Sequence, residues 1–195
     1  MIIAIANDEA FNFTYQANID DLRQMGEVVF FSPLADPHLP VCDLLYLPGG
    51  YPELCAGQLN ANSAMRQSIC KYVEEDGMTF AECGGFMYLC HDIDNSEMCG
   101  VFNISASMNN ARLHLGYRSM QLNGIEMRGH EFHYSEIVSA NINEGVSVRQ
   151  CQTSASGASV STALYRYKRT IAGYTHWYWA ESGFRNTWLK ELENI

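Results

Sequence analysis

Short apolar segments recur through the first half of the chain, and each is followed by a turn or by a segment with helical spacing. A run such as MIIAIA is too short for a buried helix and is typical of a strand that is covered on both faces. Expected strands and helices alternate four times along this half of the chain. Such alternation predicts a mostly parallel sheet with helices on both faces. The expected strands are MIIAIA (1–6), EVVFFSPL (27–34), CDLLYLPGG (42–50) and MTFAEC (78–83), and the expected helices are NIDDLRQMG (18–26) and residues 59–77 with a cap at Asn62 or Ser63.

The second half of the sequence has a different texture. Segments such as LHLGYRSMQL, IEMRGHEFHYSEIV and TIAGYTHWYW are aromatic-rich and alternate in the manner of strands. No internal repeat or interior boundary divides the 195 residues, a length that suits one domain. We therefore expect residues 1–195 to form a single α/β domain with a flavodoxin-like parallel sheet and a β-rich C-terminal part.

Charge and cysteine usage narrow the functional classes. The net charge of −10 disfavours nucleic-acid or anionic-membrane partners. No apolar run approaches the ~20 residues of a membrane span, and the N-terminus lacks signal-peptide character, so a cytoplasmic protein is expected. The seven cysteines never form a C-x-x-C pair, and no metal site is predicted.

One cysteine has a context that the other six lack. In AECGGFMYL (81–89), Cys83 lies where an expected strand turns sharply into an expected helix, a geometry that exposes a nucleophile. A helix N-terminus favours a thiolate, and the amide of Gly84 points to where an oxyanion would form. A second amide is expected from Gly49 or Gly50, which end the neighbouring strand.

A cysteine nucleophile also needs a base, and the chain has six histidines. His176, in GYTHWYW, ends an apolar strand and is placed to face the site. For His38, and for His91 on the helix expected after Cys83, a surface or core role is the better interpretation. Any one of these residues alone could be structural, but the strand-end glycines, the elbow and the late histidine together favour a thiol enzyme.

Six segments resemble one family, in order along nearly the whole chain. They are DEAFNFTY (8–15), FFSPL (30–34), PGGYPEL (48–54), AECGGFMYL, LGYR (115–118) and RGHEFHYSE (128–136). Together they look like the glutaminase domain of cobyrinic acid a,c-diamide synthase. The resemblance implies a class I glutamine amidotransferase fold, with Cys83 as the nucleophile on glutamine and His176 as base and acid. It also implies that the ammonia is passed to an ATP-activated carboxylate on a corrinoid or related tetrapyrrole.

Two departures from the family pattern matter. Many class I amidotransferases carry a glutamate two residues after the histidine, where this chain has Tyr178. Glu131 is a candidate to orient the imidazole or contact substrate, although a salt bridge to Arg128 or another partner is an equal alternative. The phosphate loop G-x-x-x-x-G-K-[ST] of the family's synthetase half does not occur.

The missing phosphate loop leads to expectations about partners. ATP and magnesium are expected on a separate synthetase part, no cofactor is expected here, and the chain is either an excised domain or a stand-alone subunit. The synthetase should dock around the mouth of the site. Aromatics such as Phe11, Phe13, Tyr51 and Tyr134 are candidates for that contact, with a core or pocket-lining role as an equal alternative for each.

Three other functions stay open from the sequence. A cysteine hydrolase with the same elbow would not explain DEAFNF or RGHEFHYSE. An amidotransferase for a nickel tetrapyrrole precursor or a cell-wall intermediate shares nearly every motif. A non-catalytic interaction subunit would have no need of both Cys83 and His176.

Overall fold

The computed structural model describes residues 1–193, and a mixed seven-stranded sheet forms its centre. In spatial order the strands are β11 (Val146–Arg149), β13 (Leu164–Tyr167), β14 (Thr170–Gly173), β4 (Met78–Glu82), β3 (Leu44–Leu47), β1 (Ile2–Ala6) and β2 (Glu27–Phe31). The pairs from β14 to β2 are parallel, whereas β13 and β11 are antiparallel to their neighbours. The mostly parallel sheet predicted from the sequence is confirmed.

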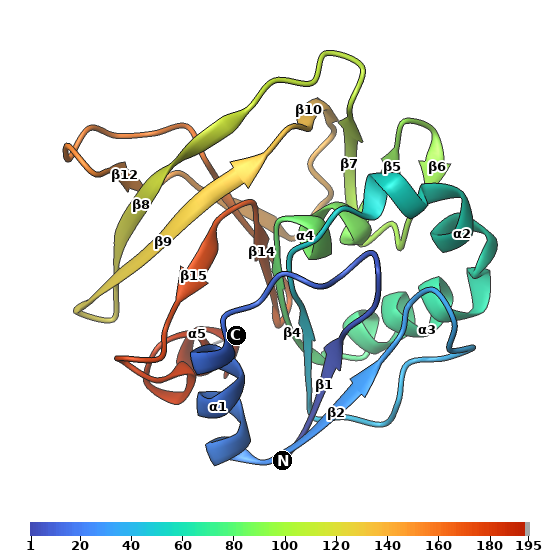
Figure 1. The fold of residues 1–195 in the computed structure, drawn as a ribbon, viewed down its shortest axis with the longest axis horizontal. Helices are drawn as coiled ribbons and strands as arrows, with labels where there is room; N and C mark the ends of the chain where they lie inside the picture. The colour runs from blue at the N-terminus through green and yellow to red at the C-terminus, as the bar shows by residue number, and fades with distance from the viewer. Residues whose placement is uncertain (194–195) are drawn as a thin grey trace.

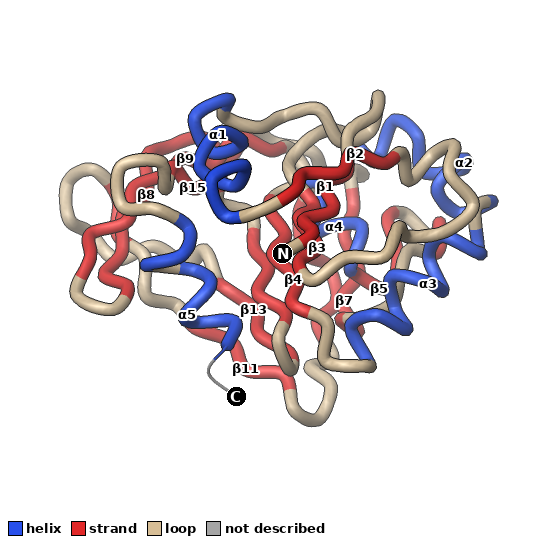
Figure 2. The backbone as a smooth tube through the Cα atoms, turned by 90° about the horizontal axis from the view of Figure 1, so that it is seen from below, coloured by secondary structure: helices blue, strands red, loops and turns tan. Residues whose placement is uncertain are grey.

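Helices cover both faces of this sheet. Along β1 the side chains alternate, so that Ala4 and Ala6 pack in one apolar cluster while Ile3 and Ile5 pack in the other. Figure 2 shows α1 and α5 on one side of the central strands and α2 and α3 on the other. The helices are α1 (Gln16–Met25), α2 (Ala56–Ala61), α3 (Ser63–Glu74), α4 (Gly84–Leu89) and α5 (Trp188–Glu193), with short 3₁₀ turns η1 (Pro52–Cys55) and η2 (Phe184–Asn186).

The helix expected over residues 59–77 is interrupted at Asn62, which separates α2 from α3. The Asn62 side chain accepts a hydrogen bond from the Met65 amide at 3.3 Å, which confirms the predicted cap. Its amide group also donates to the carbonyls of Pro33 and Asp36, both at 2.9 Å. These hydrogen bonds to the loop after β2 fix the break between α2 and α3. They could not be predicted from the residues next to Asn62 in the sequence.

Two other expectations are wrong. β2 is joined to β3 by residues 32–43 without a helix, so the strand–helix alternation is incomplete. His91 does not lie on a helix, because α4 ends at Leu89 and the chain continues as the strand β5. The apolar residues around β5 (Cys90–Ile93) have the spacing of a helix. The segment is nevertheless a strand, because its backbone pairs with that of β7 (Phe102–Ser107).

Two four-stranded sheets make up the β-rich part. One contains β10 (Glu136–Ala140), β7 (Phe102–Ser107), β5 (Cys90–Ile93) and β6 (Ser96–Glu97). The other contains β12 (Thr153–Ser154), β8 (His114–Leu122), β9 (Ile125–His133) and β15 (His176–Tyr178). Figure 1 shows the long β8–β9 hairpin standing to one side of the central sheet, with β15 between the two. Its turn is Asn123–Gly124, where both residues have positive φ, as a two-residue hairpin loop requires.

The loops at the carboxyl ends of β1, β3 and β4 come together, as predicted. Phe13, in the loop after β1, donates its amide to the carbonyl of Gly49 at 3.0 Å. The Gly85 amide donates to the carbonyl of Pro48 at 3.0 Å, and the Cys83 amide donates to Gly173 at 2.8 Å. Parallel sheets place their ligand sites at this edge. Among the helices of residues 1–193, none has the length and apolar character needed to cross a membrane.

Candidate active site

Cys83 occupies a strained turn between β4 and α4. Its φ of 47° and ψ of −105° are rarely adopted by a residue with a side chain, and such a conformation costs about 1–3 kcal/mol. The two following glycines permit the turn, because a Cβ on Gly85 would lie 2.1 Å from the carbonyl oxygen of Leu47. The strand–turn–helix geometry that the sequence predicted is confirmed.

The thiol of Cys83 is buried, with 4% of the residue exposed. Its Sγ lies 3.8 Å from the carbonyl oxygen of Phe132 on β9. Burial raises the pKa of Cys83 to about 12, and the negative charge of Glu53 raises it further, while the Gly84 amide lowers it. Desolvation thus outweighs the favourable effect of the Gly84 amide at the start of α4, and the sulfur depends on a base for its activation.

A cavity of about 260 Å³ opens beside this sulfur. Residues from five separate segments line it: Asn12, Phe13, Gly50, Tyr51, Cys83, His130, Phe132 and His176. Aromatic rings form most of the wall, which excludes water from the sulfur. The predicted nucleophile and the predicted base thus share one small cavity.

His176 is held in the wall of this cavity by close packing. Its ring lies against the backbone of Gly49, since a Cβ at that position would be 2.1 Å from Cε1 of the imidazole. Phe13 meets the ring edge to face, with centroids 4.6 Å apart. Within residues 1–193, Nδ1 of His176 is buried and has no hydrogen-bond partner.

The environment of His176 favours the neutral imidazole. Burial lowers the pKa of His176 to about 3, with smaller contributions from the neighbouring His130 and His133. A general base must be unprotonated to accept a proton, and His176 is in that state at any pH above this value.

A second histidine, from the motif RGHEFHYSE, also faces the cavity. His130 pairs with His176 across β9 and β15, and the two rings stack with centroids 4.9 Å apart. The hydroxyl of Tyr15 lies 2.7 Å from Nδ1 of His130. The motif RGHEFHYSE was the available signal, but only the strand register shows which of its histidines reaches Cys83.

The glycines predicted to bind an oxyanion lie on the same wall. Gly50 lines the cavity, and a Cβ on Gly84 would be 3.0 Å from the Gly50 nitrogen, so the two backbones are adjacent. Gly49 lies directly beneath the His176 ring, and its carbonyl accepts the Phe13 amide. This arrangement suits Gly84 and Gly50 as amide donors and gives Gly49 a steric role; donation to an oxyanion stays a prediction.

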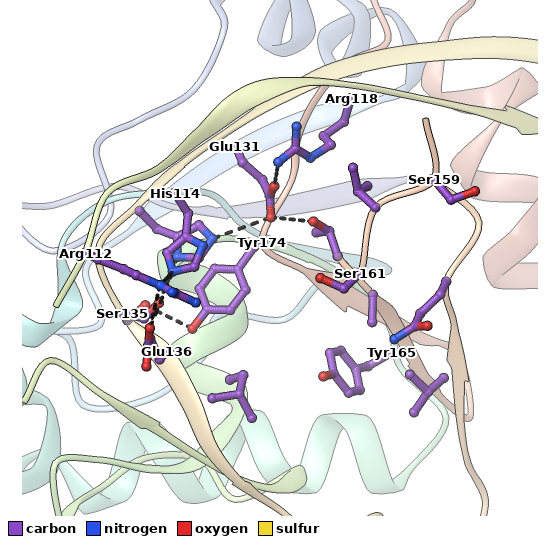
Figure 3. Close-up of a pocket in the computed structure, with 17 residues that line it drawn as sticks. Arg112, His114, Arg118, Glu131, Ser135, Glu136, Ser159, Ser161, Tyr165 and Tyr174 are labelled. Atoms are coloured by element: carbon purple, nitrogen blue, oxygen red, sulfur yellow. Dashed lines mark hydrogen bonds and ion pairs between the residues drawn. The ribbon is translucent and has the colours of Figure 1, made fainter. Parts of the chain in front are cut away.

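Glu131 points away from His176 and into a second cavity of about 650 Å³. Figure 3 shows its carboxylate directed at Arg118, with which it forms an ion pair. It also accepts a 2.8 Å hydrogen bond from Thr162 and lies 3.5 Å from Nε2 of His133. Side chains alternate along β9, so His130 and Phe132 face Cys83 while Glu131 and His133 face the opposite side. The partner of Glu131 is Arg118, and Arg128 pairs with Glu126 instead.

We expect Gly49→Ala to impair the site while leaving the fold in place. The added methyl group would overlap the imidazole at 2.1 Å and push His176 away from Cys83. A displacement of about 1 Å can cost roughly 100-fold in rate, so kcat should fall strongly. Gly57→Ala is the matched control, because a Cβ there meets no atom within 4 Å. Equal glutaminase rates for the two variants would contradict the position of the ring.

The described residues 1–193 contain no group of three or more His, Cys, Asp or Glu side chains placed to hold a metal ion. The cavity beside Cys83 is lined by its thiol, two imidazoles, three other aromatic rings, the Asn12 amide group and the Gly50 backbone.

Comparison with known proteins gives a consistent result. Residues 2–184 match the model of the CobB/CobQ-like glutamine amidotransferase domain. A cobyrinate a,c-diamide synthase of Methanothermobacter thermautotrophicus is 45% identical over 71% of the chain, and one of Fusobacterium nucleatum is 41% identical over 90%. A hydrogenobyrinate a,c-diamide synthase of Pseudomonas aeruginosa is 38% identical over 90% of the chain. The chain spans 33% to 41% of the length of these relatives.

Solved structures agree on the fold. A structure described as a GMP synthase component from Thermoplasma acidophilum superimposes with a TM-score of 0.60 at 17% identity, covering 98% of this chain and 94% of that one. A structure described as a glutamine amidotransferase gives a TM-score of 0.58 at 16% identity, with 89% of each chain covered. With the family match over nearly its whole length, this chain belongs to the CobB/CobQ-like glutamine amidotransferase domain family.

Proposed function

We propose that this chain is the glutaminase part of an ATP-dependent amidotransferase that converts cobyrinate to its a,c-diamide. The observation that carries the proposal is the shared cavity, which Cys83, His176 and Gly50 line, with the backbone of Gly84 next to that of Gly50. The family match and the names of the relatives support the same conclusion.

In the proposed reaction, His176 takes the proton of the Cys83 thiol as the sulfur attacks the side-chain amide carbon of glutamine. The amides of Gly84 and Gly50 stabilise the oxyanion that forms. His176 then gives its proton to the departing nitrogen, which leaves as ammonia, and a γ-glutamyl thioester remains on Cys83. Water, deprotonated by His176, hydrolyses the thioester to glutamate and restores the thiol.

The acceptor of the ammonia is proposed from the relatives. Their names include both cobyrinate and hydrogenobyrinate a,c-diamide synthases, which act on closely related tetrapyrrole carboxylates. We propose that ATP and magnesium activate the carboxylate on a synthetase part and that this domain needs no cofactor of its own. All seven cysteines are free, which suits a reducing cytoplasmic location.

The synthetase part is proposed to dock around the mouth of the cavity. Phe13, Tyr51 and Tyr134 are 40%, 39% and 37% exposed there, as the sequence analysis expected. Phe11 is fully buried, so of the two alternatives it takes the core position and has no part in such a contact. Two more exposed apolar side chains are Leu54, at 80% and three residues after Tyr51, and Tyr117, at 74% and opposite His130 in the β8–β9 pair. Exposed apolar clusters of this kind mark protein interfaces.

The isolated chain should bind no ATP and should hydrolyse glutamine slowly, well below the median enzyme turnover of roughly 10 per second. Adding the synthetase part of a relative should raise this rate, because docking completes the site. Leu54→Ser and Tyr117→Ser should reduce the stimulation and leave the basal rate unchanged. Calorimetry with ATP and a steady-state glutaminase assay provide the two measurements.

Val41→Ser is the control for this surface. Val41 is 88% exposed but lies just before the amino end of β3, at the edge of the sheet opposite the cavity. It should leave both the basal and the stimulated rates unaltered. Tight ATP binding, or full turnover without a partner, would contradict the proposed dependence on a synthetase.

A further inference from the structure

The strand that carries His176 lies at the edge of its sheet. β15 pairs with β9 on one side only, and side chains bind its backbone where a further strand would otherwise lie. Asn18, fully buried on α1, donates to the Trp177 carbonyl at 2.8 Å and accepts from the Trp179 amide at 3.1 Å. Glu82 accepts from the Trp177 amide at 2.8 Å. Two buried polar side chains therefore fix the position of β15.

Glu82 joins the two halves of the site directly. It is the last residue of β4, next to Cys83, and its hydrogen bond ends on the amide that follows His176. Its second carboxyl oxygen accepts from the hydroxyl of Tyr46 at 2.7 Å, on the neighbouring strand β3. Glu82, next to the nucleophile, is thus hydrogen-bonded to Trp177, next to the base. Tyr46 on a third strand holds the carboxyl group in place.

Burying this carboxyl group is unfavourable. Only 2% of Glu82 is exposed, and burial raises the pKa of Glu82 to about 8. The ion pairs found among residues 1–193 do not include it. A hydrocarbon side chain would avoid this desolvation cost but would leave the Trp177 amide and the Tyr46 hydroxyl without their acceptor, so the acid at this position serves these two hydrogen bonds.

His176 has an unusual need for a fixed backbone. Its Nδ1 has no hydrogen-bond partner in the described chain, and Tyr178 stands where a carboxylate could orient the ring. The direction of the imidazole therefore depends on its packing against Gly49 and on where β15 lies. A shift of the Trp177 backbone would move the base relative to Cys83.

We propose that Glu82 is a positioning residue, whose hydrogen bond to the Trp177 amide sets the position of His176 relative to Cys83. The proposal rests on the glutaminase function proposed above. Glu82 touches no reacting atom in this scheme, and its effect passes through the backbone of β15.

Substitutions at position 82 test this role. Glu82→Met keeps the length and apolar volume but removes the acceptor, and it should lower kcat roughly 10- to 100-fold with KM changed little, as misplacement of a catalytic group does. Glu82→Gln keeps a carbonyl oxygen for Trp177 and can donate to the Tyr46 oxygen, so it should restore nearly the wild-type kcat. The rate at which a glutamine-like diazo-ketone labels Cys83 should follow kcat in both variants. Circular dichroism and thermal melting establish that each variant is folded.

The control and the second variant make the test decisive. Thr170→Val removes a buried hydroxyl that has no hydrogen-bond partner, at the far end of β14, and should leave kcat unaltered. If Glu82→Met fails to fold, Glu82→Asp takes its place, because the shorter side chain draws the oxygens away from Trp177; kcat should fall in the same way.

Three outcomes separate the possible errors. Wild-type kcat and labelling in folded Glu82→Met would overturn the positioning role. A Glu82→Gln variant as impaired as Glu82→Met would overturn it too, since the acid itself would then be required. A wild-type chain that neither hydrolyses glutamine nor reacts at Cys83 would instead show that the proposed glutaminase function is wrong.

Discussion

Cys83→Ser should reduce glutamine hydrolysis to background, a loss on the order of 10⁵- to 10⁶-fold. A serine hydroxyl is a far weaker nucleophile than a thiol, and its proton is much harder for His176 to remove. Steady-state glutaminase assays with and without the synthetase part measure the loss. A glutamine-like diazo-ketone should label the wild-type chain once, at Cys83, and should not label the variant. Full activity in Cys83→Ser would end the assignment of the nucleophile.

The strained backbone conformation of Cys83 can be tested separately from its chemistry. Cys83→Gly and Cys83→Ala both lack the thiol and should be equally inactive. The glycine variant accepts a φ of 47° without steric cost, so its free energy of unfolding should exceed that of the alanine variant by about 1 kcal/mol. Chemical denaturation measures the difference. If Cys83→Ala were the more stable, the turn would not be strained as described.

His176→Ala should lower kcat by roughly 10²- to 10⁴-fold, the usual cost of losing a general base. His130→Ala should cost less, because His130 stacks on His176 and bonds to Tyr15 rather than occupying the buried position itself. His133→Ala should also cost less, since its ring faces the second cavity and stacks on Tyr174. Melting curves for the three variants distinguish a loss of chemistry from a loss of fold.

The pH dependence of the wild type tests the same assignment. A base must be unprotonated to act, and the pKa of His176 is lowered to about 3 by burial, while that of Cys83 is raised to about 12. Between pH 5 and pH 7, which lies below the raised pKa of Glu82 at about 8, neither group changes its charge, and kcat/KM should be nearly flat wherever the chain is folded. An acid limb with a midpoint near that of an ordinary histidine, about 6.5, would point to a more exposed imidazole as the base.

Much of this protein could be read from short stretches of sequence. The apolar runs of β1, β3 and β4 define buried strands, and the adjacent glycines at 84 and 85 mark the sharp turn after Cys83. Strand ends, caps and turns depend on residues that are close along the chain. Because the carboxyl ends of parallel strands meet at one edge, the strand pattern also placed the PGGYPE loop beside Cys83.

Contacts between segments far apart in the sequence determined the remaining features of the site. The register of β9 against β15 brings His130 onto His176 and turns Glu131 toward Arg118, and a shift of one residue would exchange those faces. The pKa values of Cys83 and His176 depend on how completely the surrounding elements exclude water. Local sequence determined where the nucleophile lies, because strand and turn are properties of neighbouring residues. The surroundings of its base, and the link from Glu82 to Trp177, were decided only by tertiary packing, because they join residues separated by about half the chain.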